Sequence, residues 1–294
     1  MRKAYLQMHI AIVLWGFTAI LGKAIQLDEG LLVWYRMFLS AAAIGIFLVF
    51  KKKFEKISLK QLGHLSLIGL IITLHWVTFY GAIKASNVSV AIVCFSSVAL
   101  FTAILDPLSR GERPKKIELF LSLIAMFGIY YIFSVQKLYV KGIILSLISA
   151  FLAAVFSIMN KRISNKINPG TITFYELGTG FLLLTLLLPL WFNINHSGFQ
   201  IPGTNDIILL LILSIACTTF AFTLSLYALQ KIDTFTMNLS LNLEPLYSII
   251  LAIIIFHEHE LLGKEFYIGS AIIFSSIIVH GLLIMKARYR KIRT

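Results

Sequence analysis

The sequence predicts an all-α integral membrane protein with ten transmembrane helices, arranged as two inverted five-helix repeats. The prediction rests on composition, on ten long apolar stretches and on a weak internal repeat. Of the 294 residues, 59% are hydrophobic and only 13% are charged. A chain of this composition lacks the polar side chains that a surface in water requires. Most of the surface is therefore expected to face lipid.

Charge is distributed as expected around a membrane. A net charge of +13 could indicate a nucleic-acid partner, but 20 of the 26 Lys and Arg residues lie in the two termini and in short connections on one side. The other side carries five, and Arg36 lies within a helix. The positive-inside rule therefore places both termini in the cytoplasm of a multi-pass protein of the cytoplasmic (inner) membrane. We expect the lipid bilayer as a partner and no nucleic acid.

Ten stretches have roughly the 20 apolar residues that a helix needs to cross a bilayer. The first follows Met1-Arg2-Lys3 and is too long for a signal peptide, so it is expected to be retained. An even number of helices agrees with termini on one side. The ten stretches are 4–25, 30–50, 62–83, 87–108, 117–135, 142–162, 171–191, 206–228, 236–256 and 265–286.

An internal repeat divides the chain into residues 1–137 and 138–294. Trp34-Tyr35-Arg36 matches Phe174-Tyr175-Glu176, and the segment that begins at Tyr80 matches the one that begins at Tyr227. These matches keep one order, at offsets of 140 to 147 residues. Because each half has an odd number of helices, the second half would enter the membrane from the opposite side.

Several motifs resemble the EamA-type transporters of the drug/metabolite transporter superfamily. They are Leu14-Trp15-Gly16, Asn242-Leu243-Glu244-Pro245-Leu246, His257-Glu258 and Gly269. The resemblance covers both halves. It implies a central cavity lined by the first, third, fourth, sixth, eighth and ninth helices, and export of amino acids or other small metabolites. It does not identify the solute.

Glu244 is the strongest candidate for a buried polar site. It lies about 10 to 15 Å deep in its predicted helix, too far for a glutamate to reach the interface. Asn238 and Asn242 lie on an adjoining face of that helix, and Pro245 frees a backbone carbonyl one turn earlier. Glu244 could contact a substrate amine or carry a proton. The alternative is a structural hydrogen bond at the proline kink.

A second group of candidates forms an aromatic surface on the third helix, where His75 and Phe79 share one face and Trp76 and Tyr80 share the next. Trp15 on the first helix and Thr223 and Tyr227 on the eighth could face it. An aromatic cavity with a few polar groups suits a small molecule. Helix packing and an interfacial aromatic belt are the alternative.

Other polar residues have structural interpretations. Arg36 is expected to extend to the outer interface, and a direct salt bridge between Arg36 and Glu176 is not expected, because the two enter from opposite faces. Asp106 and Glu112 are expected to pair with nearby arginines in solvent. Small residues on the sixth helix, from Ser146 through Ala150, Ala153 and Ser157 to Asn160, indicate close helix packing.

No cofactor or metal is expected. The histidines and glutamates at 257–260 lack the spacing of a zincin site, and Cys94 and Cys217 lie in apolar segments as small hydrophobes. No Walker A or GxSxG motif is present, so ATP hydrolysis and covalent catalysis are not indicated.

The sequence thus predicts a secondary transporter, an exporter of a small metabolite that works by alternating access. Protons are a candidate coupled partner, with Glu244 and His75 as the deep titratable groups. A membrane-embedded enzyme acting on a lipid-linked substrate would need catalytic groups clustered near one interface. A structural or receptor protein would not need polar groups at the midplane.

Overall fold

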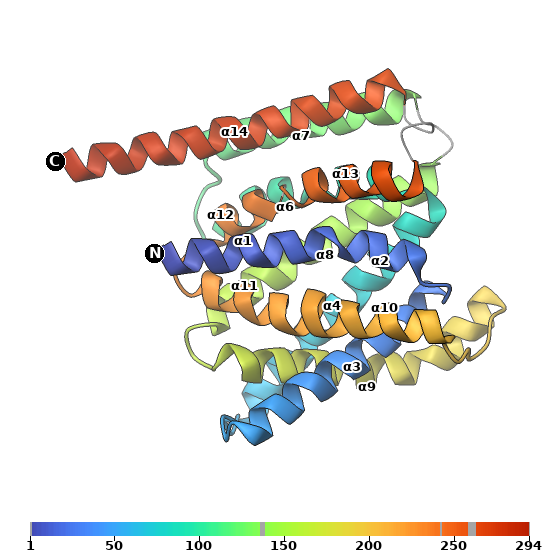
Figure 1. Cartoon of the computed structure of the whole chain (residues 1–294). Coiled ribbons are helices and arrows are strands. Elements are labelled where there is room, and N and C mark those ends of the chain that lie inside the picture. The colour runs from blue at the N-terminus through green and yellow to red at the C-terminus, as the bar shows by residue number, and fades with distance from the viewer. Residues whose placement is uncertain (1, 136–138, 242, 258–262, 294) are drawn as a thin grey trace.

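The computed structural model describes residues 2–135, 139–241, 243–257 and 263–293 of the chain. Within these ranges the fold is helical and contains no strand (Figure 1). The helices are α1 (Arg2–Gly16), α2 (Thr18–Ala24), α3 (Glu29–Phe50), α4 (Leu59–Ala85), α5 (Val88–Phe95), α6 (Val98–Leu108), α7 (Lys116–Val135), α8 (Val140–Ile163), α9 (Pro169–Asn195), α10 (Thr204–Ser214), a π-helix (Ile215–Phe220), α11 (Ala221–Leu229), α12 (Thr234–Leu241), α13 (Glu244–Phe256) and α14 (Lys264–Arg293).

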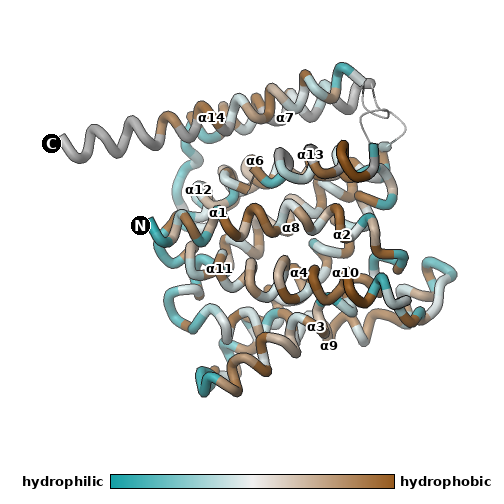
Figure 2. Tube along the Cα trace, in the orientation of Figure 1, coloured by the Kyte–Doolittle hydropathy of each residue, from teal (hydrophilic) through white to brown (hydrophobic). Residues whose placement is uncertain are grey.

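Seven segments of the described chain are long and apolar enough to cross a membrane. The predicted stretches 117–135, 236–256 and 265–286 also contain helices, but they are not among these seven. In Figure 2 the helices are predominantly hydrophobic and the hydrophilic residues gather at the connections. The seven segments are Arg2–Ala24, Glu29–Phe50, Leu59–Ala85, Val88–Leu108, Val140–Ile163, Pro169–Asn195 and Thr204–Leu229.

The outer face of α9 shows what surrounds the molecule. Leu182, Leu186 and Leu190 repeat every four residues and are 61%, 77% and 56% exposed. Residues spaced by four lie on one face of a helix. A continuous exposed leucine stripe of this kind would be costly in water and is favourable in lipid.

Helix starts coincide with the polar turn signals in the sequence. Asp28 caps α3 by accepting a hydrogen bond from the Leu31 amide, and Ser58 with Gln61 forms a capping box at the start of α4. Asn168 caps α9, whose first residue is Pro169. These caps satisfy amide groups that a helix terminus leaves without an intrahelical partner.

Three predicted helices are interrupted, so the expectation of continuous helices at 4–25, 87–108 and 236–256 is wrong. The first breaks at Phe17, and beside this break the Ser248 hydroxyl donates a hydrogen bond to the Gly16 carbonyl. The second breaks at Ser96 and Ser97. The third restarts at Glu244 because Pro245, which lacks an amide hydrogen, fits only the first turn of a helix.

A further irregularity lies in the predicted stretch 206–228, which contains the π-helix Ile215–Phe220. The Thr218 and Thr219 hydroxyls donate to the carbonyls of Leu213 and Ser214, each five residues earlier. The wide turn also binds α3, since Ser40 donates to the Ser214 carbonyl at 3.0 Å. Single π-helical turns of this kind are frequent at functional sites.

The helices pack around α4, which contacts α8 and α9 most extensively, while α3 packs on α9 and α1 on α11. At one edge of the bundle α7 and α14 lie side by side (Figure 1). The N-terminal end of α1 and the C-terminal end of α14 lie at the same end of the molecule. Helices α1 to α5, α8, α11, α12 and α13 surround the centre.

Candidate functional site

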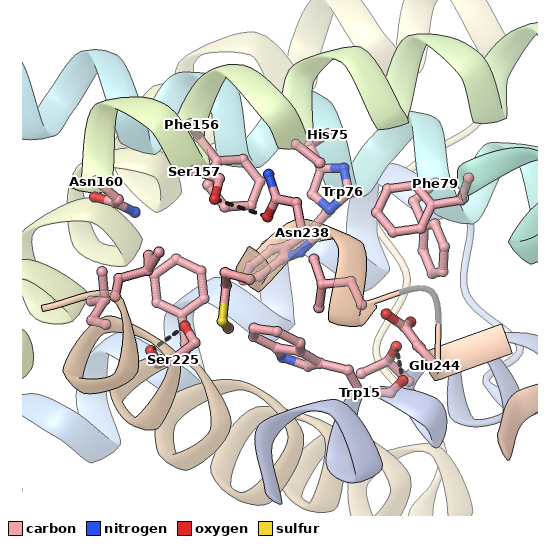
Figure 3. Close-up of a pocket in the computed structure, with 18 of the residues that line it drawn as sticks. Trp15, His75, Trp76, Phe79, Phe156, Ser157, Asn160, Ser225, Asn238 and Glu244 are labelled. Carbon is pink, nitrogen blue, oxygen red and sulfur yellow. Dashed lines mark hydrogen bonds between the residues drawn. The ribbon is translucent and has the colours of Figure 1, made fainter. Parts of the chain in front are cut away.

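A cavity lies at the centre of the bundle, between residues of the two halves of the chain (Figure 3). About 80 Å³ of it is accessible to the centre of a water-sized molecule. Its walls come from α1 to α5 of the first half and from α8, α11, α12 and α13 of the second. The lining residues are Trp15, Thr18, Arg36, His75, Trp76, Phe79, Phe95, Ala153, Phe156, Ser157, Asn160, Phe222, Ser225, Leu226, Leu229, Met237, Asn238, Leu241 and Glu244.

The structure brings together six of the ten residues that the sequence singled out as a substrate site. They are Trp15, His75, Trp76, Phe79, Asn238 and Glu244. Figure 3 shows them around one space, to which they extend from α1, α4, α12 and α13. The apolar part of this wall is largely aromatic, and its polar groups are few.

The other four predicted residues do not line the cavity in the described part of the chain. Tyr80 lies behind the wall, fully buried, and Tyr227 is half-buried on α11. Thr223 donates to the Thr219 carbonyl and meets the Thr173 hydroxyl at 3.3 Å, toward α9. On α11, which follows the π-helix, Phe222, Ser225 and Leu226 line the cavity instead. Asn242 lies outside the described residues.

The expectation that the Arg36 side chain extends to the outer interface is wrong. Arg36 is only 2% exposed and lines the cavity. Its Nε donates to the Thr218 hydroxyl at 2.7 Å, its Nη1 donates to the Tyr80 hydroxyl at 2.7 Å, and its Cζ lies 3.8 Å from the centroid of the Trp76 ring. The π-helix and the aromatic face of α4 therefore hold a cation in the protein interior, where stacking on Trp is favourable.

Glu244 brings a carboxyl group to the cavity. It begins α13, and the partial positive charge of a helix N-terminus favours a carboxylate there. Its side chain is 5% exposed and faces the same cavity as Arg36. In Figure 3 it lies beside Trp15. The cavity thus presents one carboxyl and one guanidinium group within largely aromatic walls.

His75 is fixed by α8. Its Nδ1 lies 3.0 Å from the Ser149 carbonyl, and the Ser149 hydroxyl donates to the His75 carbonyl at 3.0 Å. The Ser149 hydroxyl also lies 2.8 Å from Nδ1, and the tautomer of the ring decides which atom donates in these contacts. The ring packs among Phe79, Phe95 and Phe156. His75 therefore contributes an anchored ring to the wall.

Asn238 connects three helices. Its Nδ2 donates to the Thr102 hydroxyl on α6 at 2.8 Å, and its Oδ1 accepts from the Ser157 hydroxyl on α8 at 3.0 Å. These bonds position the amide at the cavity wall, as Figure 3 shows for Ser157 and Asn238.

Glu176 is fully buried in α9, and its described hydrogen bond joins Oε2 to the Asn160 amide at 3.4 Å. No ion pair between Glu176 and Arg36 is present among the described contacts. The small-residue face of α8 packs tightly as predicted, and Ser146 donates to the Ala91 carbonyl at 2.5 Å. Ala153, Ser157 and Asn160 of the same face also line the cavity.

The predicted pairing of Asp106 and Glu112 with a nearby arginine is confirmed. Arg110 pairs with Asp106 at 2.8 Å and with Glu112 at 3.1 Å, but Asp106 is buried and so does not lie in solvent as expected. Residues 258–260 of the histidine and glutamate loop lie outside the described part. Within that part, no group of three His, Cys, Asp or Glu side chains could hold a metal ion.

Sequence reasoning missed Arg36, Phe95, Phe156, Phe222 and Ser225 as cavity residues. A signal existed for Arg36, because a buried arginine needs aromatic and hydroxyl partners, and Trp76 and Tyr80 were already assigned to a polar aromatic surface. The phenylalanines gave no such signal, since phenylalanine serves equally well in the core and against lipid.

The comparisons with known proteins agree with this architecture. The model of the EamA-like transporter family matches residues 2–134 and 140–282. A protein of Archaeoglobus fulgidus described as an uncharacterized transporter is 28% identical over 270 residues, covering 87% of this chain and 90% of that protein. One of Clostridium kluyveri with the same description is 22% identical over 297 residues, covering 94% of each. One solved crystal structure shares the fold, with a TM-score of 0.72 and 18% identity over 98% of this chain and 99% of that one.

Proposed function

Because the chain belongs to the EamA-like transporter family, we propose that it is a secondary transporter which exports a small metabolite, an amino acid or related solute, across the cytoplasmic membrane. The observation that carries this proposal is the central cavity, in which Arg36 and Glu244 face a space between the two halves. A solute with both a carboxylate and an ammonium group could pair with both charges. The aromatic walls would hold its apolar part.

The proposed architecture is ten membrane-crossing helices in two inverted repeats. Interrupted helices support it, because α6 restarts at Val98 and α13 at Glu244, 146 residues apart, close to the 147 that separate Tyr80 from Tyr227. Helices interrupted at corresponding positions of two repeats typically flank a transport site. Both termini at one end of the molecule agree with an even number of crossings.

Alternating access would require contacts between the halves to break at one end of the molecule at a time. At one end, the backbone N–H of Gln26 donates to the Asp206 carboxylate at 3.2 Å, and the Trp191 indole N–H donates to the Asp28 carboxylate at 3.1 Å. At the other, Arg162 donates to the Ser109 carbonyl at 2.7 Å. Each such bond contributes only about 0.5 to 1.5 kcal/mol net. That is weak enough for these contacts to serve as gates.

The second candidate, a membrane-embedded enzyme for a lipid-linked substrate, receives less support. The cavity's charged and titratable side chains, Arg36, His75 and Glu244, are divided among three helices and surrounded by phenylalanine and tryptophan. Catalysis at a lipid interface would place such groups together near a membrane surface.

A thermal-shift screen tests the function. Purified protein in detergent would be melted with amino acids, nucleosides, sugars and organic acids, in parallel with Glu244→Gln and with Glu112→Gln as a matched surface control. A ligand at 100 times its dissociation constant stabilises the native state by about 2.7 kcal/mol. We expect one solute class to raise the Tm of the parent and of Glu112→Gln but not of Glu244→Gln.

Two outcomes would count against the proposal. Equal stabilisation of all three proteins would remove Glu244 from the binding site. No stabilisation by any solute would contradict binding of these solute classes in the cavity.

A further inference from the structure

Two buried side chains, Glu176 on α9 and Asn160 on α8, meet at one end of the cavity, and neither has been given a role in solute binding above. Asn160 lines the cavity, whereas Glu176 is fully buried behind it. Figure 3 places Asn160 at the opposite end of the cavity from Glu244. The pair is therefore separate from the charges that face the solute.

Two oxygen atoms of this pair lack hydrogen-bond partners in the described structure. They are Glu176 Oε1 and Asn160 Oδ1, both buried. The one bond between the residues, from Asn160 Nδ2 to Glu176 Oε2, is 3.4 Å long, beyond the usual 2.7 to 3.2 Å range of such bonds. A buried oxygen without a donor is costly and needs an explanation.

No cation compensates the Glu176 carboxylate in the described structure. Among the charged and titratable groups of α3, α4, α8 and α11, none forms a described ion pair or hydrogen bond with it. An ionised carboxylate in this position would lack both a counter-ion and sufficient donors, and it would lie at a depth where burial of charge is expensive. Those groups are Glu29, Tyr35, Arg36, Lys60, His64, His75, Tyr80, Lys84, Lys141, Lys161, Arg162 and Tyr227.

A single proton removes the uncompensated charge of the carboxylate. Once protonated, the carboxyl group becomes a donor, and a half-turn of the Asn160 amide presents Oδ1, which otherwise lacks a donor, as its acceptor. The same turn moves the Nδ2 donors of Asn160 away from Glu176. The charge state of Glu176 then decides whether the amide offers a donor or an acceptor to the cavity.

We propose that Glu176, with Asn160 between it and the cavity, is the binding site of a proton that is exchanged for the exported solute. The inference rests on the proposed transport function and adds the coupled ion to it. In the binding step, one O–H bond of a hydronium ion breaks and one forms on the Glu176 carboxylate, which changes from charge −1 to neutral. The proton is released to water when the cavity opens to the other side.

The backbone of Glu176 packs closely against α4. A Cβ on Gly69 of α4 would lie 2.4 Å from the Glu176 carbonyl, so the two helices are in close backbone contact there. The described link from the Glu176 carboxyl to the cavity is its hydrogen bond with Asn160, so the proposed proton exchange takes place on that side.

Infrared spectroscopy of the purified protein tests the site without any solute. A protonated carboxylic acid has a carbonyl band distinct from that of a carboxylate. We expect the band at neutral pH to keep its intensity in Glu112→Gln and to lose intensity in Glu176→Gln, whose amide has the shape of the protonated acid. A band of unchanged intensity in Glu176→Gln would overturn the assignment.

Flux measurements test coupling. Vesicles containing the protein and a radiolabelled mixture of the twenty amino acids would be given a proton gradient or a sodium gradient. We expect the proton gradient to accelerate efflux through the parent, and Glu176→Gln to lose that response while it still exchanges labelled for unlabelled amino acids. An unchanged response in Glu176→Gln, a response of the parent to sodium alone, or no response to either gradient would overturn the proposal.

The two proposals fail in different ways. If the parent moves none of the label, export of amino acids is contradicted, while the infrared band still decides whether Glu176 holds a proton.

Discussion

Arg36 is the residue on which the chemistry of the cavity most depends. Two of its guanidinium N–H groups are used by Thr218 and Tyr80, and the plane lies against Trp76. Because guanidinium has five N–H donors, others remain for a solute carboxylate. A lysine in this position would have the same charge but a single ammonium, and it could not satisfy all these partners at once.

Arg36→Lys should therefore bind the solute more weakly while keeping the charge. Loss of one charge-assisted hydrogen bond costs about 1.5 to 3 kcal/mol, which lowers affinity roughly tenfold or more. The measurement is the concentration of solute that gives half the maximal thermal shift. Arg110→Lys, at the half-exposed pair with Asp106, serves as a control and should match the parent. Equal affinity in all three would show that Arg36 only holds the helices together.

Individual residues also show the limits of the sequence. The depth of Glu244 was readable, because a glutamate far from both interfaces of an apolar helix must face a polar partner or a cavity. For Arg36 the possible partners Trp76 and Tyr80 were a signal but not a decision, because a long side chain near a helix start can reach either water or the interior. Only the packing of α3 against the π-helix decides between these two directions.

At the scale of elements, the length and order of the apolar stretches were predictable, but the interruptions within them were not. Pro245 indicated a kink, and it coincides with the start of α13. The breaks at Phe17 and at Ser96 and Ser97 depend on contacts with other helices, such as that of Ser248 with Gly16. Hydropathy alone contains no information about such contacts.

The contact between α4 and α9 gives a matched test of element packing. Gly69→Ala would place a Cβ 2.4 Å from the Glu176 carbonyl, and backbone cannot yield without separating the helices. We expect a loss of about 1 to 3 kcal/mol in stability and a lower Tm in detergent. Gly178 lies on α9, two residues from Glu176, and a Cβ added there would meet no atom within 4 Å. Since alanine favours helix more than glycine does, the Tm of Gly178→Ala should be unchanged or higher. A Gly69→Ala protein as stable as Gly178→Ala would contradict the close contact.

At the scale of the whole molecule, the distribution of Lys and Arg predicts orientation. In a background with Cys94→Ala and Cys217→Ala, single cysteines would replace Gly198, in the exposed connection after α9, and Lys53, in the exposed connection after α3. A membrane-impermeant maleimide should label Gly198→Cys in intact cells and Lys53→Cys only after permeabilisation. Labelling in the reverse pattern would invert the proposed topology.

The central claim is that a solute crosses the membrane through the cavity that Arg36 and Glu244 face. Counterflow in vesicles tests it most directly: vesicles loaded with an unlabelled solute are diluted into a trace of the same labelled solute. The account predicts that the parent and Glu112→Gln transiently accumulate label and that Glu244→Gln does not. Accumulation by Glu244→Gln equal to that of the parent would contradict the role of this cavity. No accumulation by any of the three, with a solute that stabilises the parent, would contradict transport.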